Sequence, residues 1–384
     1  MSEKIVEKFD PDGVGVRNGN YFGMTFTPEN ASLVLLSVPW DVTSSYGGGA
    51  SAAPDAMIEE STQLDFHDPW APGAWRRGIA TIPIDYSIAE KSIFFRKDAS
   101  KIIEALEAGA DVSLSRKLDR VNSMSHEIDD EVYAVSAAWL AAGKTVGLVG
   151  GDHSTPLGLI RAVAEREGSI GILHFDAHCD LREAYEGFDC SHASIMFNVL
   201  RDVPGVEKIV QVGVRDFSEV EARFAAAHPK IVQFPGAELA ENEFRGENWA
   251  MQTERIVAAL PDKVYVSFDV DFLSPEFCPG TGTPVPGGRS FDEAMWLLRR
   301  VVDSGRRIVG FDLCEVSPRQ DSTWDANVGA RILFRLCGQA LREVPKGQIT
   351  RENPNGRKLR NAADVQAPRE NPNRQALRKT SEKA

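Results

Sequence analysis

The 384-residue sequence lacks the features that mark secreted and membrane proteins. Its five cysteines are scattered, without Cys-x-x-Cys spacing, which is typical of reduced thiols in the cytosol. No apolar run reaches the ~18 residues that a membrane span needs. The first eight residues are charged and lack the apolar core of a signal peptide. We therefore expect a cytoplasmic protein with no membrane partner.

The chain also has fewer basic than acidic residues. The chain has 43 Lys and Arg against 56 Asp and Glu, for a net charge of −13. This balance argues against a nucleic-acid partner and favours a small cationic substrate, because an acidic surface raises the local concentration of cations. The 42% hydrophobic content is sufficient for a sizeable core.

The most informative stretch is Leu173–Asp180, the end of an apolar strand. Asp176, His178 and Asp180 follow at alternate positions, and alternate residues of an extended chain point the same way. A lone Asp or His here is usually a helix cap or turn residue. Three together would bring like charges into contact with nothing to compensate them.

Two more predicted strands end in the same kinds of residue. The strand beginning at Val264 ends in Asp269 and Asp271, and the strand beginning at Val146 ends in Gly-Gly-Asp and then His153. Together the three strand ends offer two histidines and four carboxylates. Ligands of an open α/β sheet lie at the carboxyl ends of its strands, so the pattern predicts a metal site there.

Predicted strands alternate with predicted helices, which indicates an α/β fold with a mostly parallel sheet and helices on both faces. We expect an irregular N-terminal arm (1–31), one catalytic domain (32–343) and a polar, disordered tail (344–384). The tail repeats one pentapeptide, Arg351–Asn355 and Arg369–Asn373; docking of this locally basic tail onto a neighbouring acidic subunit is the alternative. Predicted strands are 32–38, 146–149, 170–175, 264–268 and 308–313; predicted helices are 52–64, 104–142 with a break at about 111–122, 156–167, 217–227, 248–260 and 326–341.

Five motifs in this order resemble those of the ureohydrolases, the family of arginases, agmatinases, formiminoglutamases and guanidine hydrolases. The motifs are Gly150–Ser154, Asp176–Asp180, Ser267–Asp271, Pro279–Gly288 and Gly310–Val316, and the similarity covers about Ser32 to Leu341. The resemblance implies a three-layer α/β/α fold, two divalent metal ions per subunit, and trimers or hexamers.

The resemblance also implies a role for each site residue. One ion would take His153 and Asp180, the other His178 and Asp271, and Asp176 and Asp269 would bridge the two. A hydroxide between the ions would attack a guanidinium carbon, giving urea and ammonia or an amine. His192 would relay a proton to the leaving nitrogen, and Glu315 would grip the guanidinium nitrogens.

The substrate is less firmly indicated. Residues 181–188 do not match the arginase pattern. Three segments resemble guanidine hydrolases: the N-terminal arm, the Trp-, Pro- and Gly-rich segment after Gln63–His67, and the loop Trp40–Ser44. Bulky residues are predicted to close the pocket around free guanidine: Trp40, Tyr46, Trp70, Trp75 and Trp324. Agmatine, or another guanidino acid or amine, is the alternative. The guanidine hydrolase branch implies nickel, the wider family manganese, and the ligand types suit either ion.

Two other classes of protein fit parts of the pattern. A catalytically silent metal-binding paralogue would be expected to lack His192, Glu315 or a ligand, and none is missing. A deacetylase on this fold would use one zinc ion, against which the six ligands argue. We place His174 in the core or behind the ligands, while His67, His126 and His228 belong to no motif.

Overall fold

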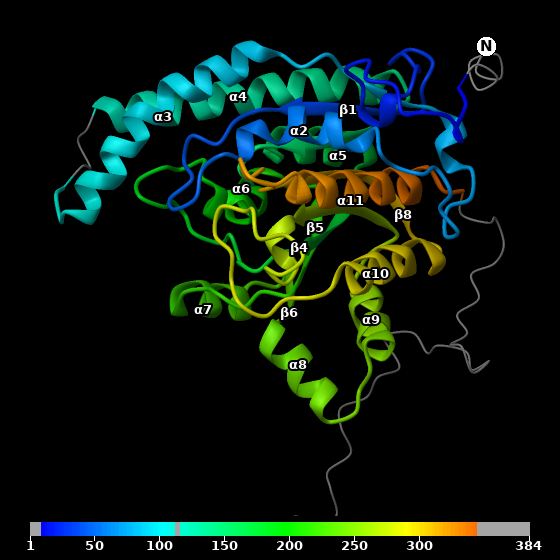
Figure 1. The fold of residues 1–384 in the computed structure, drawn as a ribbon. Helices are drawn as coiled ribbons and strands as arrows, with labels where there is room; N and C mark the ends of the chain where they lie inside the picture. The colour runs from blue at the N-terminus through cyan, green and yellow to red at the C-terminus, as the bar shows by residue number, and fades with distance from the viewer. Residues whose placement is uncertain (1–8, 112–115, 344–384) are drawn as a thin grey trace, which may run out of the picture. The chain divides into compact units, whose positions relative to one another are not determined.

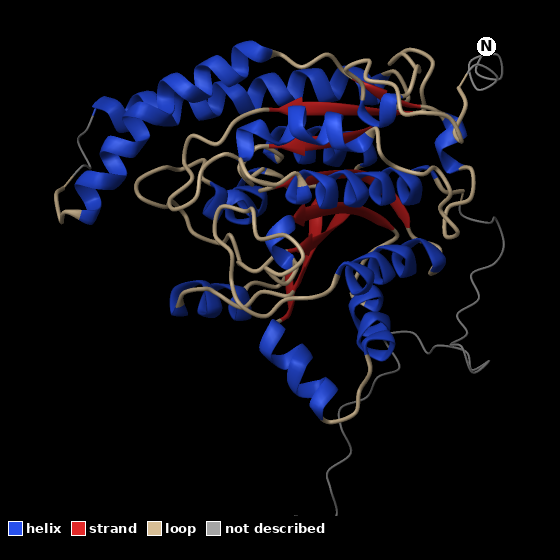
Figure 2. Ribbon diagram, viewed as in Figure 1, coloured by secondary structure: helices blue, strands red, loops and turns tan. Residues whose placement is uncertain are grey.

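The computed structural model describes residues 9–111 and 116–343. Its centre is one sheet of eight strands, all pairing in parallel, in the order β2-β1-β3-β8-β7-β4-β5-β6 (Figures 1 and 2). The strands are β1 (Leu33–Val38), β2 (Ile79–Thr81), β3 (Thr145–Gly150), β4 (Ile170–Phe175), β5 (Val206–Val212), β6 (Ile231–Phe234), β7 (Lys263–Asp269) and β8 (Arg307–Cys314). The predicted mostly parallel sheet is confirmed.

Helices cover both faces of the sheet (Figure 2). One apolar cluster joins the sheet to α2 (Ala53–Ser61), α8 (Gly236–Phe244), α9 (Trp249–Ala258), α10 (Phe291–Asp303) and α11 (Trp324–Leu341). The other cluster joins it to α3 (Tyr86–Glu107), α4 (Arg116–Ala141), α5 (Leu157–Glu167), α6 (Ile195–Asp202) and α7 (Glu219–Ala227). The three-layer α/β/α fold is therefore confirmed.

The period-two pattern of the strands explains this division. In β1, Leu33 and Leu35 belong to the first apolar cluster, whereas Val34, Leu36 and Val38 belong to the second. A strand buried on both faces has no polar side, so its sequence is a nearly continuous apolar run. Burial on both sides drives the formation of the sheet.

The sheet order places the predicted site strands side by side. Four neighbouring strands, β3, β8, β7 and β4, form the middle of the sheet. A site residue follows the end of each: His153 after β3, Glu315 after β8, Asp271 after β7 and Asp176 after β4. Parallel strands end at the same edge, so residues up to about 160 positions apart in the chain meet there.

Several elements differ from expectation. The helical region 104–142 is interrupted as predicted, but α3 begins earlier than expected, at Tyr86, and α4 begins at Arg116, before the predicted end of the break. The short edge strands β2 and β6, the buried strand β5 and helices α6, α8 and α10 were not predicted. β2 and β6 have only three and four residues, too few to show a pattern.

The N-terminal arm contributes to the core in its described part. Tyr21 and Phe22 are buried in the first apolar cluster, and the Phe22 N–H donates to Ser61 Oγ at 2.7 Å. The predicted tail lies outside the described residues. None of the described helices has the length and apolar character of a membrane span.

Candidate metal centre

Six side chains converge at the carboxyl edge of β3, β4 and β7. We call this set the central site: His153, Asp176, His178, Asp180, Asp269 and Asp271. His153 Nδ1 faces three carboxylate oxygens, Asp176 Oδ2 at 3.1 Å, Asp180 Oδ2 at 3.2 Å and Asp269 Oδ2 at 3.3 Å. The structure thus brings together all six ligands that the sequence predicts.

The protonation of His153 follows from its hydrogen bonds. Its Nε2 lies 2.8 Å from Ser267 Oγ, and the Ser267 hydroxyl donates to Asp312 Oδ1 at 3.2 Å. Because Ser267 has used its only proton, it accepts from His153 Nε2–H. The lone pair of a neutral His153 is then on Nδ1, aimed at the three carboxylates. A cation between them would turn this repulsion into attraction.

Asp176 links this first group to a second one. His178 Nδ1 lies 3.0 Å from Asp271 Oδ2 and 3.4 Å from Asp176 Oδ1. Asp176 therefore turns Oδ2 to His153 and Oδ1 to His178. Such a carboxylate can bridge two ions. Asp269 approaches the first group through Oδ2, while its Oδ1 accepts the Asp271 N–H at 2.8 Å.

These separations fit a divalent ion in each group. Neighbouring ligands of an octahedral ion at ~2.1 Å are separated by about 3.0 Å. The distances of 3.0–3.4 Å between ligand atoms are close to that value. Nitrogen and carboxylate ligands without thiolate suit manganese, nickel and zinc.

The electrostatics also favour cations here. Burial and the neighbouring Asp176 raise the pKa of Asp180 to about 6. Burial, Asp271 and Asp176 raise the pKa of Asp269 well above its ordinary value. Carboxylates that resist ionisation when crowded become good ligands once positive charge compensates them.

His174 supports the site from behind. Gln211 Nε2 donates to Cys179 O at 2.7 Å and to His174 Nδ1 at 2.9 Å, so the His174 proton lies on Nε2. That Nε2 lies 2.8 Å from Asp176 Oδ2. His174 therefore lies directly behind Asp176, in the core where the sequence placed it, and it is also one of the buried side chains that could reach an ion in the first group.

Glu315 follows β8 beside the first group. Its Oε1 accepts the His153 N–H at 2.9 Å, and its backbone has a φ of 63°, unusual for a residue with a side chain. A Cβ added to Gly282 would lie 2.9 Å from Oε2, so glycine there leaves room for that oxygen. Burial and the nearby Asp152 raise the pKa of Glu315 well above its ordinary value.

Gly151 lets the His153 turn pass close to β1. A Cβ at Gly151 would lie 1.9 Å from Trp40 O, and the neighbouring Asp152 N–H donates to that same oxygen at 2.9 Å. Only glycine permits this approach. The Gly-Gly of the motif is therefore part of how His153 is positioned.

A cavity of about 500 Å³, which we call the substrate cavity, opens over the central site. His178, Asp180 and His192 line it. His192 Nε2 lies 3.5 Å from Ser45 Oγ, whereas its buried Nδ1 has no hydrogen-bond partner among the described residues. Burial lowers the pKa of His192 to about 4.

The outer wall of the substrate cavity carries charge of both signs. Arg182 stacks on the Tyr185 ring at 4.7 Å, and the Tyr185 ring meets His192 edge-on at 6.0 Å. Arg182 Nε is 3.6 Å from Glu221 Oε2, and Asp216 also lines the wall.

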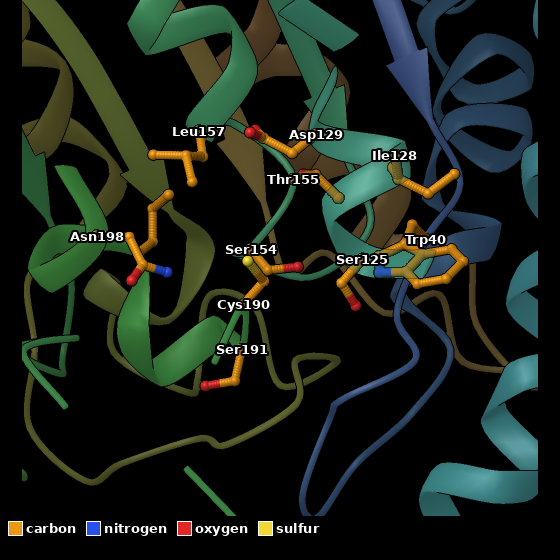
Figure 3. A pocket seen from close by; sticks show the side chains of 11 residues that line it. Trp40, Ser125, Ile128, Asp129, Ser154, Thr155, Leu157, Cys190, Ser191 and Asn198 are labelled. Atoms are coloured by element: carbon orange, nitrogen blue, oxygen red, sulfur yellow. The ribbon is translucent and has the colours of Figure 1, made fainter. Parts of the chain in front are cut away.

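The predicted aromatic closure of the pocket is largely wrong. Of the five residues, only Tyr46 lines the substrate cavity, and it is 85% exposed. Trp40 is buried and lines a different, water-sized cavity (Figure 3). Trp75 packs on Phe9 and Phe66, Trp70 lies against Arg299 and Arg335, and Trp324 donates to Phe277 O. Composition could not show that these four tryptophans lie in the core or at the surface, away from the substrate cavity.

Comparison with known proteins supports the interpretation of the site. The sequence profile of the arginase family matches residues 31–338. The chain belongs to the arginase family. It is 30% identical to the N(1)-aminopropylagmatine ureohydrolase of Thermus thermophilus over 332 residues, covering 86% of this chain and 97% of that protein. It is also 30% identical to the agmatinase of Proteus mirabilis over 321 residues, covering 82% and 90%.

Solved structures show the same fold. The proclavaminate amidino hydrolase of Streptomyces clavuligerus has a TM-score of 0.66 at 24% identity and covers 86% of this chain and 99% of its own. A putative agmatinase from Clostridium difficile has a TM-score of 0.63 at 26% identity, with coverages of 82% and 98%. The protein is thus an arginase-family ureohydrolase of the agmatinase-like type.

Sequence reasoning missed four contributors to the site. Ser267 orients His153, Gln211 orients His174, and Arg182 with Tyr185 forms the cavity wall. Ser267 had a detectable signal, since it shares the alternation of Asp269 and Asp271. Gln211 lies on an unpredicted strand, and its contact with His174 depends on the pairing of β4 with β5.

Proposed function

We propose that this protein hydrolyses a guanidinium C–N bond of a small cationic guanidino compound, free guanidine first, releasing urea and ammonia. The observation that carries this proposal is the pair of ligand groups sharing Asp176, beneath a cavity that presents His192. Two divalent ions held there would supply the Lewis acidity that activates water at neutral pH.

The residues around the central site have the chemistry that this reaction needs. Glu315 has one carboxylate oxygen fixed by the His153 N–H, so Oε2 is free to accept an N–H of the guanidinium. This bond would orient the planar cation. Burial makes the charge pair stronger than it would be in water.

His192 is suited to move a proton. Its lowered pKa keeps the ring neutral at pH 7, with one nitrogen able to accept a proton and the other able to donate. A neutral imidazole beside the substrate can pass a proton to the leaving nitrogen, which departs as ammonia.

Arg182 supports guanidine over substrates with a cationic tail. Its guanidinium lines the substrate cavity next to Tyr185, so a second positive charge on the substrate would meet it. Free guanidine has a single charge and no tail. Agmatine is the second candidate, favoured by the Asp216 carboxylate in the same wall and by similarity to proteins named agmatinases.

The test is urea release by purified protein loaded separately with nickel and with manganese. Guanidine, agmatine and 4-guanidinobutanoate are offered side by side. We expect guanidine turnover, highest with nickel. Turnover of agmatine alone would replace the substrate in this proposal, and no urea from any of the three would contradict it.

An Arg182→Gln variant tests the basis of the selectivity. Removing one partly exposed charge should raise kcat/KM for agmatine relative to guanidine by about tenfold, or about 1.4 kcal/mol. The matched control is Arg223→Gln, which removes an exposed charge on α7 outside the residues lining the cavity. An unchanged ratio in Arg182→Gln would show that this wall does not select the substrate.

A further inference from the structure

A second set of ligand-type side chains lies away from the central site. His126 lies on α4, and Asp189 and Cys190 lie on the segment between His178 and His192. His126 Nε2 is 3.2 Å from Asp189 Oδ2 and 4.0 Å from Cys190 Sγ, and His126 Nδ1 is 3.4 Å from the same sulfur. No sequence motif marks His126, since the fold alone brings it to residues 63 and 64 positions further along the chain.

These distances are close to those of a tetrahedral metal site. With metal–ligand bonds of about 2.0 Å to N and O and 2.3 Å to S, the N···O and N···S separations are roughly 3.3 Å and 3.6 Å. The observed 3.2 Å needs no change, and the observed 4.0 Å needs a shift of a few tenths of an ångström. The His126 side chain is about half exposed, so its ring can move by that amount.

The surroundings of this set are charged. His126 and Cys190 line a cavity of about 230 Å³ together with three carboxylates and two guanidinium groups, those of Asp129, Asp130, Asp202, Arg161 and Arg201. Figure 3 shows Asp129 and Cys190 lining the neighbouring water-sized cavity. Arg161 pairs with Asp129 and Asp130, and Arg201 pairs with Asp202.

Asp189 is left without such compensation. Among the described residues its only charged partner is His126, and its Oδ1 is buried with no hydrogen-bond partner there. Beside it, Cys190 is buried, and burial raises the pKa of the free thiol to about 12. A buried carboxylate oxygen without a partner is costly, and metal binding would relieve that cost.

We propose that His126, Asp189 and Cys190 bind one thiophilic divalent cation of the zinc and cobalt class, separate from the central site. The Cys190 Sγ–H bond is broken as the S–metal bond forms, and the proton leaves to solvent. Water takes the fourth position. The ion ties α4 to the segment that carries His192 two residues later.

Cobalt binding to the full-length protein tests this proposal. None of the six central side chains is a cysteine, but Cys314 lies beside His153, so the near-ultraviolet thiolate-to-cobalt absorption is assigned to the second set by its loss in Cys190→Ser. We expect this absorption in the parent protein. We expect its loss, with one ion fewer per chain, in both Cys190→Ser and His126→Ala.

The exposed His67 provides a matched control, since His67→Ala should keep the absorption and the ion. Cys190 is buried, so its substitution could disturb folding. His126 is half exposed, so His126→Ala should fold normally and keeps the test valid. Absence of the band in the parent protein, or its persistence in Cys190→Ser or His126→Ala, overturns the proposal. The outcome is independent of urea release and of the central site.

Discussion

Asp176 faces both ligand groups of the central site, so its removal should abolish most of the stabilisation that metal ions give the fold. We predict the change in melting temperature on adding manganese to metal-free protein. At a free ion concentration 100 times Kd, each occupied site stabilises the folded state by about 2.7 kcal/mol, hence about 5.4 kcal/mol for two.

The unfolding entropy, which scales with the size of the domain, relates this free energy to a change in melting temperature. The described residues, 9–111 and 116–343, belong to one compact unit. At about 2.1 cal/mol/K per residue, its unfolding entropy is about 0.7 kcal/mol/K. The parent protein should therefore gain about 8 °C, and His178→Ala, which retains the first group, about 4 °C. Asp176→Ala should gain less than about 2 °C.

Differential scanning calorimetry with and without chelator measures these shifts, and the exposed His67→Ala variant should show the full 8 °C. A full shift in Asp176→Ala would refute the reasoning, because it would mean that the stabilising ions bind elsewhere. A parent shift of only about 4 °C would indicate one ion.

Three further predictions concern residues around the site. His192→Asn should lower kcat by about 10²–10⁴-fold in the urea-release assay, with metal content measured by mass spectrometry unchanged; loss of metal would show a structural role instead. Gln211→Leu should weaken metal binding by about 10–100-fold in dialysis against metal buffers, because His174 would no longer be held to present its proton to Asp176; unchanged affinity would count against that support. Gly151→Ala should lower the free energy of unfolding by about 2–3 kcal/mol in urea titrations, since its Cβ would meet Trp40 O at 1.9 Å. Gly48→Ala, with open space around its Cβ, should change little, and equal effects of the two would contradict the steric argument.

The strands of the site could be predicted because both of their faces are buried. β4 and β7 are continuous apolar runs that end in alternating ligands, so a local pattern places Asp176, His178, Asp269 and Asp271 at one edge. The order in which these strands pair is a long-range property. No local pattern shows that β8 lies between β3 and β7 and brings Glu315 to His153.

Composition was a poor guide to the cavity wall. Trp40 and Trp75 are buried in the core because large apolar rings contribute most when removed from water. Arg182 and Tyr185 reach the substrate cavity because of where their loop lies, which residues 181–188 do not reveal by themselves. Of the two predicted bridging carboxylates, Asp176 has one oxygen near His153 and the other near His178, and both Asp176 and Asp269 accept a backbone N–H through Oδ1. The predicted trimer or hexamer stays a prediction.

Manganese binding at equilibrium, measured together with urea release, tests the central claim most directly. Manganese prefers nitrogen and oxygen ligands and is poorly matched to the thiolate of Cys190, so it reports on the central site. The account predicts two ions per chain, with urea release reaching its plateau as the second binds. One ion or none per chain, or full activity with a single ion bound, would contradict it.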